Sequence, residues 1–127
     1  MGKILSVVER AYHGTLEEQD DTALWLSHMI KNVGGEISVL LRGNATNYAV
    51  TGQDASGLRF GSAALSVPPE IPQDISAMIG KGISVYAVRE DLAQRGIPLS
   101  QVVGGVSLVG RAELAQLWDE HDQVWHW

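Results

Sequence analysis

The chain has 127 residues, of which 45% are hydrophobic. That length suits one domain with a sizeable apolar core, and the hydrophobic content excludes an intrinsically disordered chain. Nine Lys and Arg residues stand against fifteen Asp and Glu residues, which gives a formal net charge of −6. This balance argues against nonspecific binding to nucleic acids or to anionic membranes, because both require a basic surface.

The sequence contains no cysteine. Disulfides, thiolate metal sites and thiol chemistry are therefore excluded. The apolar run near the N-terminus is too short for a signal peptide, and no apolar run approaches the length that spans a membrane. We therefore expect a cytoplasmic protein.

The first third of the chain predicts a strand, a helix and a second strand. Residues 3–8 and 37–41 are short apolar runs, typical of buried strands. Residues 15–18 have the form of a capping box, so we expect the helix to begin there and to end at residues 34–35, two glycines. Its predicted buried face, spaced at helical intervals, consists of Leu26, Met29, Ile30 and Val33.

The middle of the chain predicts a long polar connection and a second helix. We expect a short helical turn at residues 48–50 and a loop over residues 51–66, which are polar and contain three glycines. A helix follows that is expected to end at Gly80 or Gly82. Its predicted buried face consists of Ile71, Ile75, Met78 and Ile79.

The last third continues the alternation of strands and helices. The expected elements are a strand at 83–88, a short helix at 91–95, a strand at 106–109, a helix from about Arg111 and a final strand at 123–127. This alternation predicts the α/β class. We expect a single three-layer α/β/α Rossmann-like domain over residues 1–127, with a mostly parallel sheet of about five strands.

Several segments resemble a known family. Residues 82–97, GISVYAVREDLAQRGI, and the following GVSLVGRAELAQL resemble the DsrE-like branch of the DsrE/DsrF/DsrH sulfur-relay family, and GKILSVVE and RGNATNYAV fit the same pattern. The resemblance implies a Rossmann-like fold of about five strands. It also implies a homo- or hetero-oligomer, commonly a trimer or a hexamer, and in active members a cysteine that carries a persulfide.

The position of that cysteine is occupied by a valine. In members that have it, the cysteine lies at the end of the third strand, and matching on Arg95, Gly96 and Ile97 places it at Val88. Valine cannot carry a persulfide. The sulfurtransferase activity that the resemblance implies is therefore not expected of this chain.

A ligand site is expected where the strands end. Parallel strands bring their carboxyl ends to one edge of the sheet, and open α/β sheets bind ligands there. Arg42 and Arg89 would hold an anion through their forked donors. The alternative is that these polar residues hydrogen-bond the loops or face a neighbouring subunit. The candidate ligand-binding residues are Tyr12, His13, Arg42, Asn44, Val88 and Arg89.

Acidic residues and histidines give little support for a metal or a cofactor. Glu17, Glu18, Asp20 and Asp21 are expected to stay solvated and to complement the dipole of the first helix. The histidines lack the spacing of zinc ligands, and only His13 is a functional candidate. No phosphate-binding loop, dinucleotide fingerprint or hydrolase elbow occurs. The sequence predicts no metal and no cofactor.

Two tryptophans share one face of the final strand, because side chains alternate along a strand. We expect Trp125 to pack in the core, under the last helix with Trp118. For Trp127, core packing and a subunit interface both remain open, since tryptophan is frequent in each.

The leading functional hypothesis is a DsrE-like protein that is non-catalytic in sulfur transfer. It would form a homo-oligomer and bind a small anionic ligand or a sulfur-relay partner protein at the carboxyl edge of the sheet. One alternative is an enzyme that uses Tyr12, His13 or Arg89 for non-thiol chemistry. Another is a structural partner subunit of a cysteine-bearing relative.

Overall fold

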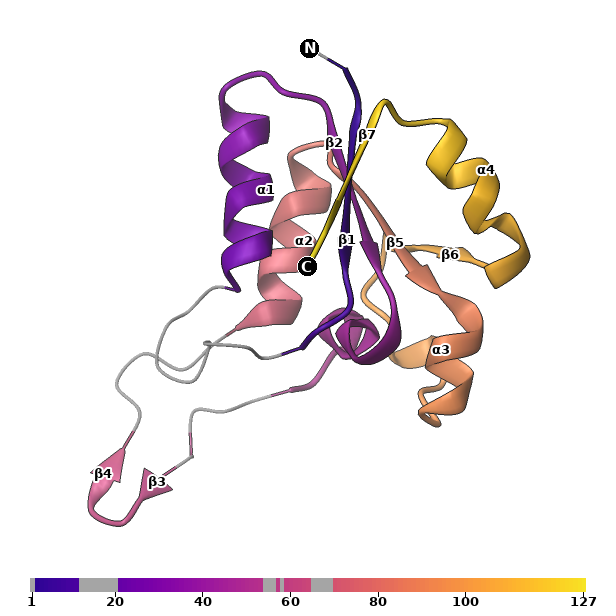
Figure 1. Ribbon diagram of the computed structural model, residues 1–127. Helices are drawn as coiled ribbons and strands as arrows, with labels where there is room; N and C mark the ends of the chain where they lie inside the picture. Colours follow the sequence, from indigo (N-terminus) through magenta and orange to yellow (C-terminus); the bar gives the residue numbers. More distant parts are fainter. Residues whose placement is uncertain (1, 12–20, 54–56, 58, 65–69) are drawn as a thin grey trace.

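The computed structural model describes residues 2–11, 21–53, 57, 59–64 and 70–127. Within them, five parallel strands form one sheet in the order β6-β5-β2-β1-β7 (Figure 1). The strands are β1 (Ile4–Val8), β2 (Ile37–Leu41), β5 (Ser84–Val88), β6 (Ser107–Val109) and β7 (Gln123–His126). Each lies within one residue of its predicted range, and the predicted α/β class is confirmed.

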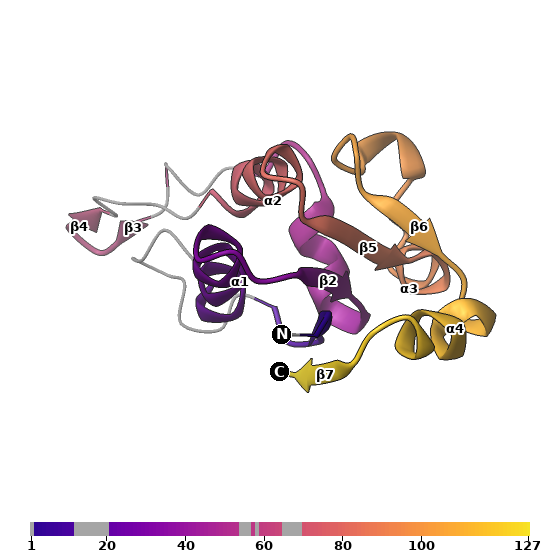
Figure 2. The same cartoon turned by 90° about the horizontal axis from the view of Figure 1, so that it is seen from above.

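Helices flank both faces of the sheet (Figure 2). The helices are α1 (Thr22–Asn32), η1 (Gly43–Ala49), α2 (Ile71–Gly80), α3 (Arg89–Gln94), η2 (Leu99–Gln101), η3 (Arg111–Glu113) and α4 (Leu114–Asp119), where η marks a 3₁₀ helix. The larger apolar cluster lies between the sheet and the helices α1, η1 and α2. A smaller cluster lies beneath α4 on the opposite face.

The order of the strands reverses beside β1. The chain adds β2, β5 and β6 in succession on one side of β1, and then returns to place β7 on its other side. All five residues of β1 are buried, as expected for a strand with neighbours on both sides. The carboxyl ends of β1 and β7 therefore flank the point of an open α/β sheet where ligands usually bind.

The first helix begins later than the sequence predicts. The expected capping box at residues 15–18 lies outside the described residues, and α1 starts at Thr22 with Asp21 as its N-cap. One carboxylate oxygen of Asp21 accepts hydrogen bonds from the Ala23 and Leu24 N–H groups at 2.9 and 3.4 Å. The other accepts from the Tyr48 hydroxyl at 2.6 Å.

Asp21 is consequently buried, and the expectation that it stays solvated was wrong. Both oxygens of this carboxylate accept hydrogen bonds from the protein, one from the helix N-terminus and one from a buried tyrosine hydroxyl. Such a carboxylate can be buried without an unpaired oxygen. The other three acids of that group, Glu17, Glu18 and Asp20, lie outside the described residues.

The buried face of α1 also differs from the prediction. Ala23, Leu24 and Ser27 face the sheet, whereas Met29 and Val33 are 36% and 82% exposed. The buried face thus combines two small side chains, Ala23 and Ser27, with the large side chain of Leu24. Leu26 and Ile30 are half-buried at the margin. The outward residues Trp25, Met29 and Val33 are called the α1 stripe below.

The region after β2 has more structure than the sequence predicts. The turn expected at residues 48–50 is part of the longer η1. Within the expected loop, β3 (Arg59–Phe60) and β4 (Ala63–Ala64) form a two-stranded hairpin of their own. The second helix agrees with the prediction, since the buried face of α2 includes Ile71, Ile75 and Met78.

The two C-terminal tryptophans have different surroundings. Trp125 is half-buried and packs against the larger cluster, whereas Trp118 packs against the smaller one, so the expected packing of Trp125 under the last helix with Trp118 was wrong. Trp127 is 43% exposed, and its indole N–H donates to the Ser6 hydroxyl at 3.0 Å. Among the residues that the structure describes, no helix has the length and apolar character required to cross a membrane.

The bond between Tyr48 and Asp21 predicts a measurable contribution to stability. Tyr48→Phe should lower the free energy of unfolding by about 1–2 kcal/mol, because a buried carboxylate oxygen loses its donor. Urea unfolding followed by circular dichroism measures this loss. Tyr86→Phe is the matched control, since the described residues offer the Tyr86 hydroxyl no hydrogen-bond partner. Equal losses for the two variants would contradict this account of Asp21.

Candidate functional site

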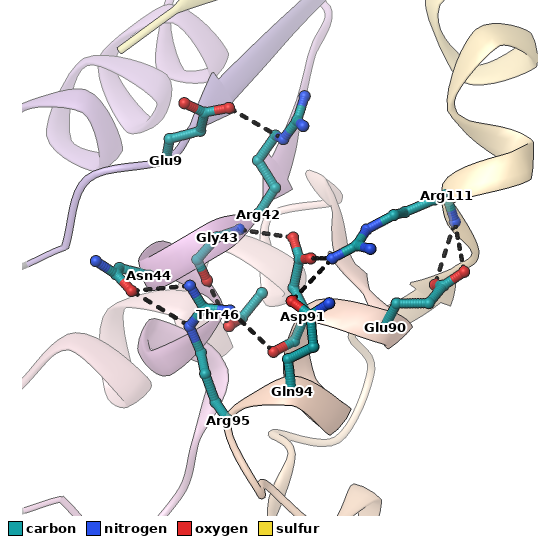
Figure 3. Close-up of polar contacts among 10 residues, drawn as sticks. All are labelled: Glu9, Arg42, Gly43, Asn44, Thr46, Glu90, Asp91, Gln94, Arg95 and Arg111. Carbon is teal, nitrogen blue, oxygen red and sulfur yellow. Dashed lines mark hydrogen bonds and ion pairs between the residues drawn. The ribbon is translucent and has the colours of Figure 1, made fainter.

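Four arginines line a crevice at the carboxyl edge of the sheet. Figure 3 shows three of them, Arg42, Arg95 and Arg111, with their polar contacts. Arg10 follows β1, Arg42 follows β2, Arg95 follows α3 and Arg111 follows β6. The cavity has a volume of about 450 Å³ and is called the carboxyl-edge crevice below. Its two acidic residues are Glu9 and Asp91. The lining therefore carries an excess of positive charge, in a chain whose net charge is −6.

Asp91 joins three of the loops that form the crevice. It lies in the first turn of α3, and its side chain is 8% exposed. Its Oδ2 accepts a hydrogen bond from the Gly43 N–H at 2.7 Å, and its Oδ1 pairs with the Arg111 guanidinium. Gly43 has a φ of 56°, so the turn after β2 uses a backbone conformation that favours glycine.

The surroundings of Asp91 stabilise its charged form. Burial alone would raise the pKa of this carboxyl. The hydrogen bonds from Gly43 and Arg111, together with the positive charges of Arg111 and Arg95, outweigh burial and hold the pKa below its usual range. Asp91 is therefore a fixed negative charge in the middle of the arginines.

Arg111 and Arg95 are held by the protein itself. Arg111 donates to Asp91 and, at 3.0 Å, to Gln94 Oε1, and its pKa is raised chiefly by the bond to Asp91. Its backbone N–H donates to both oxygens of Glu90, which lowers the pKa of that carboxyl. Arg95 donates to the Asp91 carbonyl at 3.1 Å and to Asn44 Oδ1 at 2.9 Å.

Arg42 and Arg10 have donors that no described residue engages. Arg42 Nε donates to Glu9 Oε1 at 3.1 Å, and the other Glu9 oxygen lies 3.4 Å from His126 Nε2. Within the described part of the chain, the two terminal nitrogens of Arg42 have no partner. Arg10 is exposed and makes no ion pair or side-chain hydrogen bond there. These two guanidinium groups are the ones available to a ligand.

A second cavity adjoins the crevice at the reversal of strand order. It has a volume of about 250 Å³, and Arg10 lines both cavities. The carboxyl end of β1 contributes Val8, the residue after β7 contributes Trp127, and the start of α1 contributes Thr22. The exposed indole of Trp127 is fixed by its bond to Ser6. An aromatic face beside a guanidinium suits the planar or apolar part of an anionic ligand.

The candidate residues from the sequence fall in different places. Arg42 and Asn44 line the carboxyl-edge crevice. Val88 is buried beneath α4 in the smaller apolar cluster. Arg89 is exposed at the start of α3 and lies outside the lining, next to Gly110. Tyr12 and His13 lie outside the described residues.

Sequence reasoning missed most of the lining. Arg10 directly follows a predicted strand, and Arg111 follows another, so strand ends alone would have placed both at this edge. Asp91 and Arg95 are four residues apart, which puts them on one face of a helix that begins at the same edge. Among the described residues, no group of three histidines, aspartates or glutamates is placed to hold a metal ion.

Comparisons with known proteins identify the fold. No family model and no curated protein matches the chain. The YchN protein from E. coli matches with a TM-score of 0.75 and 22% identity, over 100% of both chains. A conserved protein of unknown function from Bacteroides thetaiotaomicron matches with a TM-score of 0.68 and 14% identity, over 98% of this chain and 95% of that one.

A third solved structure, a protein of unknown function from Methanobacterium thermoautotrophicum, has a TM-score of 0.58 and 14% identity. The match covers 93% of this chain and 92% of that protein. The chain therefore has a YchN-like α/β fold, with a five-stranded parallel sheet flanked by helices and no cysteine.

The environment of Asp91 predicts a dependence of stability on pH. Because its pKa in the folded protein is lowered, its contribution is present above the usual value of about 3.9 and is lost as the pH falls through the folded value. Asp91→Asn should cost about 2 kcal/mol at pH 7. The difference from the unsubstituted protein should shrink between about pH 5 and pH 2.

Urea unfolding at a series of pH values measures that difference. Asp119→Asn is the control, because Asp119 is exposed at the end of α4 and has no partner among the described residues. A difference for Asp91→Asn that stays constant across this pH range would show that the charge of the carboxylate contributes nothing.

Proposed function

We propose that the chain is a DsrE-like protein that binds a small anionic ligand in the carboxyl-edge crevice and does not transfer sulfur. The sequence resemblance and the YchN-like fold support the family assignment. The absence of any cysteine, with Val88 at the position implied for it, supports the loss of persulfide chemistry.

The observation that supports an anionic ligand is that two of the four arginines are incompletely paired. Asp91 is engaged by Gly43 and Arg111, and Glu9 by Arg42 and His126. Among the described residues, the donors of Arg10 and the terminal nitrogens of Arg42 therefore have no carboxylate partner. An oxyanion would receive charge-assisted hydrogen bonds from both groups, the strongest kind that a partly exposed site offers.

Two acidic groups beside the crevice, Asp91 and Glu90, are poorly suited to general acid–base catalysis. General acids and bases work best with a pKa near neutrality. The pKa of Asp91 is lowered by its hydrogen bonds, and so is that of the neighbouring Glu90. Both groups are fixed carboxylates at neutral pH and weak bases, so they organise the arginines and do not move protons.

Titration with thiosulfate tests this function. Arg10→Gln and Arg42→Gln should each weaken binding measured by isothermal titration calorimetry about tenfold, the effect of one lost charge-assisted hydrogen bond. Arg59→Gln is the matched control, because Arg59 lies on the hairpin strand β3 outside the crevice. Absence of saturable binding, or an equal loss in all three variants, would refute the proposed site.

The proposed function includes self-association as a trimer or a hexamer. The resemblance implies such assemblies, and the exposed α1 stripe supports one, since Trp25 is 48% exposed beside Met29 and Val33. Adjacent apolar side chains on the outside of a helix are typical of surfaces that another subunit covers. A cysteine-bearing sulfur-relay protein is the hetero-oligomeric partner that the resemblance implies.

Charge substitution in the α1 stripe tests the assembly. Met29→Glu should shift the protein toward monomers in sedimentation velocity, because burying an unpaired carboxylate in an apolar interface is costly. Gln73→Glu introduces the same charge on the exposed side of α2 and should leave the distribution unchanged. A monomeric unsubstituted protein would contradict self-association. Co-expression with a cysteine-bearing relative then tests the hetero-oligomer.

A further inference from the structure

The α4 face of the sheet carries polar side chains near the amino ends of the strands. The helix α4 has only six residues and packs on Leu5, Leu40 and Val88. Nearer the amino edge, Ser38 of β2 lies opposite Ser84 of β5 in the sheet. The residues on either side of each serine belong to the larger apolar cluster, so both serines lie on the other face of the sheet, the one that carries α4. Two neighbouring hydroxyls on a sheet face that a helix leaves uncovered indicate a polar cavity.

A cleft of about 270 Å³ lies at this position and is called the amino-edge cleft below. It shares no residue with the carboxyl-edge crevice, which lies at the other end of the strands. Besides the two serines, its polar lining residues are Lys3, Lys31, Glu36, Tyr86, Glu120 and His121.

The backbone fixes the charged groups relative to one another. The Lys3 carbonyl accepts hydrogen bonds from the Asp122 and Gln123 N–H groups at 2.8 and 3.2 Å, which joins β1 to the segment after α4. The Ile4 N–H donates to the Glu36 carbonyl at 2.9 Å. Lys3 and Glu36 therefore stand side by side at the starts of β1 and β2.

Lys31 reaches the same cleft from the end of α1. A Cβ at Gly82 would lie 3.7 Å from Lys31 Nζ, so the ammonium group lies over the start of β5. Gly82 has a φ of 88°, which favours glycine and keeps the space beneath the lysine open. Along the sheet the charges thus alternate in sign from Lys3 to Glu36 to Lys31, with Glu120 on the α4 side.

Several of these groups have no partner among the residues that the structure describes. Among the described residues, Lys3, Lys31 and Glu36 form no ion pair and no side-chain hydrogen bond. The hydroxyls of Ser38, Ser84 and Tyr86 likewise make none there. Lys3, Glu36 and Ser84 are exposed and Lys31, Ser38 and Tyr86 are half-buried, so both signs of charge and several hydroxyls in the cleft are accessible to a polar ligand.

His121 adds a defined acceptor. Its Nδ1 lies 2.7 Å from the Leu117 carbonyl oxygen. A carbonyl oxygen only accepts, so Nδ1 carries the proton in this contact and Nε2 of the neutral ring is an acceptor. Nε2 has no partner within the described part of the chain.

We propose that the amino-edge cleft binds a small molecule that carries both an ammonium and a carboxylate group, of the class of free amino acids. Two lysines and two glutamates line the cleft, so a simple anion or cation would meet repulsion as well as attraction. A dipolar molecule satisfies both signs at once. Its carboxylate would face Lys3 or Lys31, and its ammonium group Glu36 or Glu120. The cleft volume suits a ligand of this size.

Nuclear magnetic resonance titration with L-glutamine tests this site. The amide signals of Ser38, Ser84 and His121 should shift in a saturable manner, while those of Gly43 and Arg111 stay in place. N-acetyl-L-glutamine lacks the ammonium group and L-glutamine amide lacks the carboxylate. Each should bind at least about tenfold more weakly, the usual effect of one lost charge-assisted contact.

Two lysine variants provide a matched comparison. Lys31→Gln should weaken L-glutamine binding about tenfold. Lys81→Gln should leave it within about twofold, since Lys81 donates to Asn32 outside the cleft. Ser84→Val should also abolish binding, because it replaces a hydroxyl group in the lining of the cleft with an apolar side chain. No saturable shift at these amides, equal binding of the blocked derivatives, or equal effects of the two lysine variants would overturn the proposal.

Discussion

One buried carboxylate, Asp91, holds the carboxyl edge of the sheet together. It lies at the start of the helix after β5, receives the N–H of Gly43 after β2, and pairs with Arg111 after β6. These loops are distant in sequence, and the arginines that they bring would repel one another without a central negative charge. With Arg111 neutralised and Arg95 bonded to Asn44 and the Asp91 backbone, the donors of Arg10 and Arg42 remain for a ligand.

Val88, at the same edge of the sheet, has a structural role that its apolar side chain explains. Val88 ends β5 and precedes α3, and it is packed beneath α4 with Leu117 and Val109. A valine there adds to the apolar cluster, whereas it offers nothing to a nucleophilic reaction. The junction of strand and helix keeps its structural role, and the polar neighbours Glu90 and Asp91 take part in loop organisation.

The three central strands β1, β2 and β5 were predictable because each is a short run that is mostly apolar and mostly buried in the sheet. The ranges 37–41 and 83–88 needed no knowledge of distant contacts. The orientation of α1 was not predictable from helical spacing alone. At the N-cap of this helix, Asp21 is buried and accepts a hydrogen bond from Tyr48, which is distant in sequence. The small residues Ala23 and Ser27 then face the sheet.

The residues of the site also include some that were predictable from the sequence and some that were not. Arg42 and Asn44 were predictable because they follow an evident strand. The role of Asp91 was not, since it depends on a long-range bond to a glycine in a left-handed turn. Arg89 directly follows β5, yet the first turn of α3 directs it away from the crevice lining toward Gly110. Strand ends identify an edge of the sheet, and only tertiary contacts select which side chains face the cavity.

The central claim is that the free donors of Arg10 and Arg42 form an anion site at the carboxyl edge. A crystal of the protein grown with selenate tests it most directly, because anomalous scattering locates selenium without reference to the protein. The account predicts a peak within hydrogen-bond distance of the guanidinium groups of Arg10 and Arg42. Selenate elsewhere on the surface, with none between these two arginines, would contradict it.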